Sequence, residues 1–177
     1  TIESDGFKLT KGERTLGFMG ATYTVDNQAI FLSDKSSIAK AFGANRARLG
    51  YGRNSGIIEV MVDISKILDW RTGNWFVNTP SDVKRMALKM ISEYEGRKIK
   101  SPRQSDLWWF LDREEVVQLI KKHGFDAVIF SEPRKERREL GLELSGGNTV
   151  AVFDPSKIHI PKKPLLRFSD IIKYINS

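Results

Sequence analysis

The sequence predicts a single α+β domain, and three features of the chain support this prediction. Segments with strand-like alternation and segments with helical periodicity follow one another without the strict strand–helix–strand order of parallel α/β folds. The 177 residues, of which 40% are hydrophobic and 10% aromatic, are enough for one substantial core. No internal repeat or long linker divides them. We therefore expect a mixed sheet or split sandwich, with residues 1–14 as a polar lead-in, 15–160 as the core, and 161–177 as a C-terminal tail and helix.

Five segments are expected to form strands. Small residues and glycines at 15–25 indicate a strand whose backbone approaches another group closely. Residues 29–32 indicate a short strand, and regular apolar alternation makes 57–64 the clearest strand of the chain. The continuous apolar runs at 126–130 and 149–153 indicate buried central strands, because a strand covered on both faces needs no polar side.

Four segments are expected to form helices. Ser33 is a suitable N-cap for a helix over 34–42, because its hydroxyl can accept a hydrogen bond from a free backbone N–H of the first turn. Amphipathic patterns predict two longer helices over 80–94 and 113–123. A further amphipathic helix is expected over 168–175, close to the end of the sequence.

The composition excludes several kinds of chemistry. Cysteine is absent, which rules out disulfides, thiolate metal sites and thiol nucleophiles, and fits a reducing compartment such as the cytoplasm. The two histidines, His123 and His159, lie in no metal-binding spacing, so we expect no metal site and no histidine-based triad. No run reaches the roughly 18 apolar residues of a membrane-spanning helix. Neither a Walker A motif nor G-x-G-x-x-G occurs.

The positive charge of the chain predicts a polyanionic partner. There are 29 Lys and Arg against 22 Asp and Glu, a net charge of +7. Nucleic acid, RNA more than DNA, is therefore an expected partner, with a merely solvated basic surface as the alternative. Four residues of one Gly-rich segment could hold phosphates and stack on a base: Arg46, Arg48, Tyr51 and Arg53. Trp108 and Trp109 could form a second stacking platform, although one of two adjacent side chains is expected in the core.

Three sequence blocks together resemble a known family. The first, I-F-L-S-D at residues 30–34, precedes the alanine-containing segment 38–42. The second is G-F-D-A-V at 124–128, and the third is V-A-V-F-D-P-S-K-I at 150–158. In this order and spacing they resemble the ADP-ribosyltransferase-like domains of bacterial and phage toxin and effector proteins, over roughly residues 15–160. The resemblance implies a split pair of small β-sheets with flanking helices, and NAD bound in the cleft between the sheets.

The resemblance also implies roles for particular residues. The NAD site would be formed by the first strand, through backbone groups, and by an aromatic and a hydroxyl further on: Met19, Gly20, Ala21, Phe31, Ser33 and Phe42. Phe31 would stack on the nicotinamide. Thr149 stands where many active members carry the catalytic Glu, and the first strand has no evident His or Arg. The candidate catalytic carboxylates are then Glu132 and Glu143 of the charged segment 132–143, and Ser33 and Thr149 are the other candidate catalytic residues.

The activity implied by the resemblance is ADP-ribosyl transfer from NAD, used as a substrate and without a metal. The acceptor would be a nucleic acid or a protein, and the chain would act as a bacterial or phage-related toxin or defence effector with an antitoxin or immunity protein as a candidate partner. The alternative is a catalytically degenerate module of the same fold that binds nucleic acid or a partner protein. A more remote alternative is a metal-dependent nuclease using Glu59 and Asp63, which share the polar face of the strand expected at 57–64.

Overall fold

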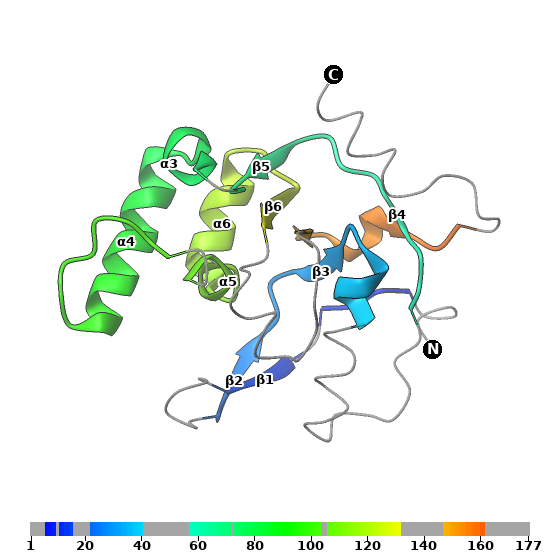
Figure 1. Ribbon diagram of the computed structural model, residues 1–177, viewed down its shortest axis with the longest axis horizontal. Helices are drawn as coiled ribbons and strands as arrows, with labels where there is room; N and C mark the ends of the chain where they lie inside the picture. The colour runs from blue at the N-terminus through cyan, green and yellow to red at the C-terminus, as the bar shows by residue number, and fades with distance from the viewer. Residues whose placement is uncertain are drawn as a thin grey trace.

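A computed structural model describes the fold over residues 6–9, 11–15, 22–40, 57–71, 73–103, 106–131 and 147–161 (Figure 1). Residues 11–15 and 22–26 are described by their backbone alone. The order of elements is β1 (Lys11–Thr15), β2 (Thr22–Asp26), β3 (Ile30–Ser33), β4 (Met61–Val62), β5 (Ile67–Asp69), α3 (Asn74–Asn78), α4 (Ser81–Glu95), α5 (Asp106–Leu111), α6 (Glu114–Lys122), β6 (Ala127–Ser131), β7 (Asn148–Val152), the short 3-10 helix η1 (Pro155–Lys157) and β8 (Ile158–His159).

A four-stranded mixed sheet with the order β3-β7-β6-β5 forms the centre of the fold. β7 pairs antiparallel with β3 on one side and with β6 on the other, and β6 pairs parallel with β5. Two further antiparallel pairs, β1 with β2 and β4 with β8, complete the described strands. The prediction of an α+β fold with a mixed sheet and flanking helices is therefore confirmed.

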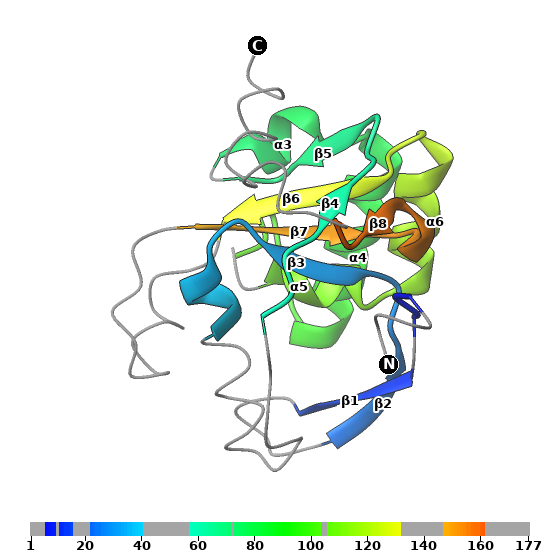
Figure 2. The same ribbon diagram turned by 90° about the vertical axis from the view of Figure 1, so that its right-hand side faces the viewer.

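Both faces of the sheet are buried, and in Figure 1 the three layers are seen side by side: helices, sheet, and the β4–β8 pair. On β6, Val128 and Phe130 belong to the core beneath the helices, whereas Ala127 and Ile129 belong to the core beneath β4 and β8. The same alternation continues on β7. Figure 2 shows β4 and α4 on opposite sides of the sheet. This double coverage explains why β6 and β7 are continuous apolar runs, as the sequence predicts.

The helical layer rests on two amphipathic helices, α4 and α6, at nearly the predicted positions. α4 buries Val83, Ala87 and Ile91 towards the sheet, and α6 buries its own apolar side. The first turn of α6 carries two Glu and its last turn carries two Lys, and these charges complement the helix dipole. Gly124 then adopts φ 79, a left-handed conformation that ends the helix at little cost for a glycine. Within the described ranges no helix combines the length and apolarity needed to cross a membrane.

The prediction of a strand over 57–64 is wrong in its length, since only Met61–Val62 pairs as β4. The alternation itself is real, because Val62 and Ile64 pack on the core while Glu59 and Asp63 are exposed. The strand is short because its partner β8 has two residues and because the chain bends at Ser65. The sequence analysis missed β5 and α3, which follow this bend.

Two other boundaries also differ from expectation. Residues 15–25 are not one strand, because β1 and β2 form an antiparallel pair in which Thr15 lies opposite Thr22. Part of the expected lead-in is therefore a strand. Ser33 is the last residue of β3 and not a helix N-cap, and helical structure begins at residue 36. The helix expected over 168–175 lies outside the described residues.

Asp126, at the start of β6, joins three segments of the chain. Its Oδ2 accepts hydrogen bonds from the Ser65 backbone N–H at 3.0 Å, the Ser65 hydroxyl at 2.6 Å and the Lys66 backbone N–H at 3.1 Å. Its Oδ1 lies 2.6 Å from Lys157 Nζ. Burial raises the pKa of Asp126, but the hydrogen bonds from Lys157 and Ser65 outweigh burial and hold the pKa well below its ordinary value.

The turn after β7 brings Lys157 to Asp126. Asp154 accepts hydrogen bonds from the Ser156 backbone N–H at 2.9 Å and its hydroxyl at 2.7 Å, which caps η1. Pro155 occupies the first turn of η1, where its missing N–H costs nothing. The blocks G-F-D-A-V and F-D-P-S-K-I therefore form one structural unit: two neighbouring strands whose ends are tied by an ion pair.

Substitution of Asp126 by Asn is expected to destabilise the fold at neutral pH by about 1–2 kcal/mol, because charge-assisted hydrogen bonds are lost. A carboxylate with a lowered folded pKa stabilises the fold above its unfolded pKa, near 4, and loses this contribution as the pH falls through the folded pKa. The difference between wild type and Asp126→Asn should therefore shrink below about pH 4. Urea unfolding at several pH values measures it. Glu59→Gln, an exposed carboxylate on the segment before Ser65, is the control, and equal effects of both substitutions would contradict the assignment.

Candidate functional site

One end of the central sheet brings together three of the residues to which the family resemblance gives a role. β3 ends beside the beginning of β7, so Ser33 lies opposite Thr149 and Phe31 opposite Ala151. On the other side of β7, Phe130 of β6 lies opposite Thr149. The residues from the first and third sequence blocks, more than a hundred positions apart, are thus cross-strand neighbours.

The same sheet end carries a polar lock that the sequence analysis missed. Asp34 Oδ1 accepts the Asn148 backbone N–H at 2.8 Å, and Asp34 Oδ2 accepts the Asn148 side-chain amide at 2.9 Å. The Asp34 backbone N–H in turn donates to the Asn148 carbonyl at 3.1 Å. On the neighbouring strand, the Ser131 hydroxyl lies 3.3 Å from Asn148 Oδ1. Three strand ends, those of β3, β6 and β7, are therefore held by one side-chain amide.

Gly147, directly before β7, allows this lock to form. A Cβ at Gly147 would lie 2.1 Å from Ile38 Cδ1 and 2.9 Å from Asp34 Oδ1, and both distances are shorter than contacts between non-bonded atoms. Ile38 is buried, so its side chain has little room to move aside. The Gly-Gly-Asn sequence before an apolar run was the one signal from which this close approach could have been predicted.

Phe31 already has an aromatic neighbour on one ring face. Its ring stacks on Trp108 of α5 with a centroid distance of 5.2 Å and an interplanar angle of 14°. Trp108 in turn contacts Phe130 edge to face at 5.3 Å. Phe31 is half-buried in the core beneath the helices. Trp108 therefore fixes the plane of the Phe31 ring and covers one of its faces.

Thr149 is in the interior of the sheet, with 1% of its surface exposed. It lies between Ser33 and Phe130 across the strands. The surrounding protein therefore covers the Thr149 side chain almost completely. The part in catalysis that the sequence suggests for Thr149 stays a prediction.

The remaining predicted site residues lie outside the described residues: Met19, Gly20, Ala21, Phe42, Arg46, Arg48, Tyr51, Arg53, Glu132 and Glu143. The described strand ends nevertheless locate one of these segments. β6 ends at Ser131 and β7 begins at Asn148, and these two residues lie opposite each other at the polar lock. The segment that carries Glu132 and Glu143 therefore leaves and rejoins the described fold at this end of the sheet.

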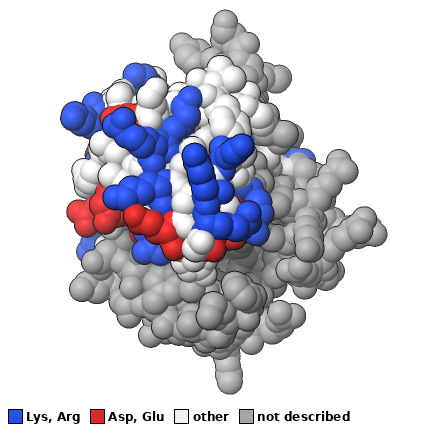
Figure 3. Space-filling view, turned by 90° about the vertical axis from the view of Figure 1, so that its left-hand side faces the viewer, with Lys and Arg blue, Asp and Glu red and all other residues white. Residues whose placement is uncertain are grey.

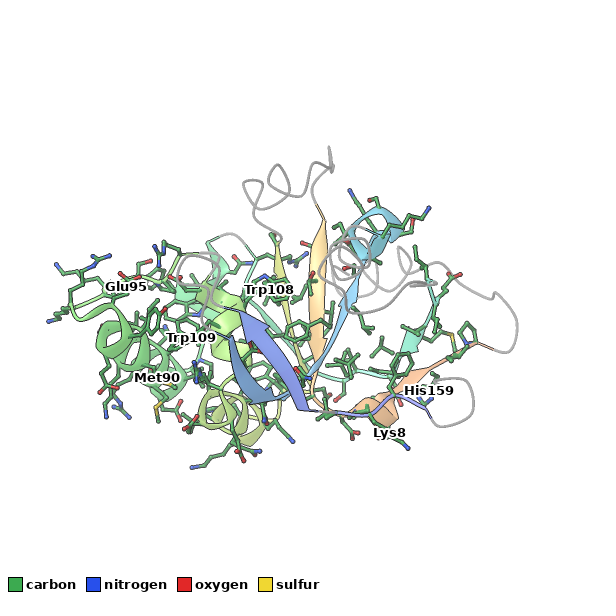
Figure 4. The ribbon with its side chains drawn as sticks, turned by 90° about the horizontal axis from the view of Figure 1, so that it is seen from below. Lys8, Met90, Glu95, Trp108, Trp109 and His159 are labelled. Atoms are coloured by element: carbon green, nitrogen blue, oxygen red, sulfur yellow. The ribbon has the colours of Figure 1, made fainter. Side chains whose placement is uncertain are left out.

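The two tryptophans of α5 face different neighbours, as Figure 4 shows. Trp108 lies towards the sheet, against Phe31 and Phe130. Trp109 lies towards α4, where its ring centroid is 5.5 Å from that of Tyr94. Both side chains are half-buried, so neither is purely a core residue or purely a surface platform.

Of the two histidines, His123 joins two helices and His159 lies on the surface. His123 Nε2 lies 2.8 Å from Asp82 Oδ1, which joins the end of α6 to the start of α4, and this hydrogen bond lowers the pKa of Asp82. His159 is exposed on β8, as expected. Among the described residues no three His, Asp or Glu side chains gather in a way that could hold a metal ion.

Disruption of the polar lock is expected to show coupling between its two partners. Asp34→Ala and Asn148→Ala should each lower the free energy of unfolding by about 1–3 kcal/mol, because each leaves a hydrogen-bonding group unsatisfied. The double variant should cost less than the sum, since the side-chain hydrogen bond is lost only once. Denaturant unfolding of the four proteins measures the coupling. Strict additivity would contradict a direct Asp34–Asn148 interaction.

Comparisons with known proteins do not assign the site. No protein-family model matches the chain, and neither curated proteins nor solved structures gave a significant match.

Proposed function

We propose that this protein is an NAD-dependent ADP-ribosyltransferase whose site lies where β3 ends and β7 begins. The observation that carries the proposal is the convergence of sequence-distant candidates at this place. Ser33 lies opposite Thr149, and Phe31 is two residues before Ser33 on the same face of β3. The segment with Glu132 and Glu143 starts and ends beside them.

The transfer would proceed by cleavage of the bond between the nicotinamide nitrogen and ribose C1′. The bonding electron pair leaves with nicotinamide, and the positive charge that develops on the ribose is stabilised by a carboxylate. The acceptor nucleophile then attacks C1′ and loses its proton. Glu143 or Glu132 would supply the carboxylate, because the Thr149 position offers a buried hydroxyl instead. Ser33 and the backbone of residues 19–21 would hold the nicotinamide amide, and Phe31 would stack on its ring.

The acceptor is proposed to be a nucleic acid, RNA before DNA, because the chain carries a net charge of +7. The arginines of residues 46–53 would hold its phosphates near the transfer site. This chemistry fits a toxin or defence effector of bacterial or phage origin, with an acidic antitoxin or immunity protein as its natural partner.

A second candidate is a binding module of the same fold without transferase activity. Two observations favour it: Thr149 is buried at the strand position of the expected Glu, and Trp108 covers one face of Phe31. Such a module would bind nucleic acid or a partner protein and leave NAD intact.

The test is incubation with NAD labelled in its adenylate phosphate and a cell lysate that is afterwards separated into protein, RNA and DNA. Nicotinamide release is followed in parallel. We expect label in the RNA fraction, and a loss of at least about 100-fold in the rate for Glu143→Ala or Glu132→Ala, as for removal of a group that stabilises developing charge. Glu59→Ala, an exposed carboxylate on another segment, is the control and should leave the rate unchanged.

The two candidates separate cleanly in this experiment. An unlabelled lysate without nicotinamide release rules out transfer and leaves the binding module. Label in the protein fraction retains the transferase and corrects the acceptor. Equal activity of both Glu variants and wild type would place the catalytic carboxylate elsewhere in the chain.

A further inference from the structure

Helix α4 and the segment that follows it concentrate the positive charge of the protein. Residues 84–103 contain seven Lys and Arg against two Glu, a local net charge of +5 out of +7 for the whole chain. Figure 3 shows Lys and Arg side chains gathered on the face over the helical layer, with carboxylates along one border. We call this surface the α4 basic face, formed by Arg85, Lys89, Arg97, Lys98, Lys100 and Arg103. All six residues are exposed.

Part of this charge is neutralised within the surface, and part is not. Glu95 binds Arg103 at 2.6 Å and Arg97 at 3.1 Å, and so holds both guanidinium groups beside the end of α4. In contrast, Lys98 and Lys100 have no carboxylate partner within the described ranges. The surface therefore combines two positioned arginines with two uncompensated lysines, and it attracts polyanions.

An exposed aromatic ring lies in the last turn of the same helix. Tyr94, in the last turn of α4, is 48% exposed, and its ring centroid is 5.5 Å from that of Trp109. Arg113 Cζ lies 4.3 Å from the Trp109 ring centroid, so Trp109 is itself packed by a cation. Tyr94 directly precedes Glu95, which fixes Arg97 and Arg103. An exposed ring packed on Trp109 thus lies one residue before the carboxylate that positions two guanidinium groups, and such groups can bind phosphates.

We propose that the α4 basic face, together with Tyr94, binds single-stranded nucleic acid. Proteins that bind single strands without reading their sequence combine a positive surface along the backbone with aromatic rings that stack on bases. A duplex would offer phosphates but keep its bases stacked inside, and would leave Tyr94 unused. The surface differs from the Arg-containing segment 46–53 and does not require NAD, so it is independent of the proposed transferase activity.

The position of the exposed apolar residues argues against a lipid surface as the ligand. Phe76 and Val77 are exposed on α3, and the Phe76 carbonyl accepts a hydrogen bond from Lys84 in the first turn of α4. Lys98 and Lys100 follow the opposite end of this helix. α4 has 15 residues, which corresponds to a length of about 20 Å. Phe76 and Val77 are therefore at the opposite end of α4 from Lys98 and Lys100, so these apolar side chains and these two lysines do not form one membrane-binding patch.

Fluorescence anisotropy without NAD tests the charge component, with labelled oligouridylate and oligothymidylate as probes. Lys98→Glu with Lys100→Glu should weaken binding of the single-stranded probes at least about tenfold. It should also make the dependence of log K on log salt shallower by about 1.4, for two lost phosphate contacts. The matched control is Lys121→Glu with Lys122→Glu, the same charge change on the exposed end of α6, which should change binding less than about twofold. Equal losses in both double variants would overturn the proposal, because net charge alone would explain them.

Substitution of Tyr94 tests the stacking component. Tyr94→Ala should weaken binding about fivefold or more, while Tyr94→Phe, which keeps the ring, should stay within about twofold of wild type. Thermal unfolding of both variants shows whether Tyr94→Ala remains folded. If Tyr94→Ala is unfolded, the stacking component is tested in the wild type instead. A base that stacks beside Trp109 should quench tryptophan fluorescence when the oligonucleotide is added.

Further arms identify other ligands. Binding of a duplex as tight as that of the single strand would overturn the stacking assignment, and so would binding to phosphatidylserine vesicles without binding to either oligonucleotide. A preference for oligouridylate or for oligothymidylate supports the proposal. Because NAD is omitted throughout, a negative result here leaves the transferase proposal unaffected, and the absence of nicotinamide release leaves this one unaffected.

Discussion

The ion pair and hydrogen bonds of Asp126 are the constraint on which the rest of the fold depends. This single carboxylate fixes the bend between β4 and β5 through Ser65 and receives Lys157 from the far end of β7. Both layers that cover the sheet are attached through it, because the bend leads into the helices and Lys157 leads into β8. A carboxylate with this many donors is well satisfied, which is why it can stand beside buried strands without destabilising them.

The structural role of Asp126 offers a second explanation for sequence blocks that resemble the transferase family. The blocks around Asp126 and Asp154 carry the resemblance, and both have sufficient structural reasons: one carboxylate joins segments, and the other caps a 3-10 turn. Residues of these types at this spacing are what a central antiparallel strand pair needs when its ends are tied together. The transferase chemistry that we propose would accordingly depend on other residues, at the opposite end of the same strands, where Asp34 and Asn148 hold β3, β6 and β7 together.

The core of the fold could be predicted from the sequence wherever a helix is buried on one face or a strand is buried on both faces. β6 and β7 are apolar without interruption, and α4 and α6 have clear helical periodicity, so all four were predicted at nearly the right positions. The boundaries of β4 and β5 could not be predicted. The segment alternates regularly in the sequence, but it bends at Ser65, which binds Asp126, a residue 61 positions later in the chain. The Asp34–Asn148 lock spans 114 residues, and no local pattern reports such a pairing. The α4 basic face was also missed, because the charge of each residue is visible in the sequence but the neighbourhood of Tyr94, Trp109 and Arg113 is not.

The order of strands in the sheet has a consequence for how the protein is made. β3 finds its partner only when β7 has been synthesised, about 115 residues later, and at typical translation rates this takes on the order of ten seconds. During this interval the backbone groups of β3 have no strand to pair with, and its apolar side chains are uncovered. Nascent chains in this state are prone to pair with one another or to be captured by chaperones. We therefore expect the time that β3 spends unpaired during translation to lower the yield of folded protein at high expression.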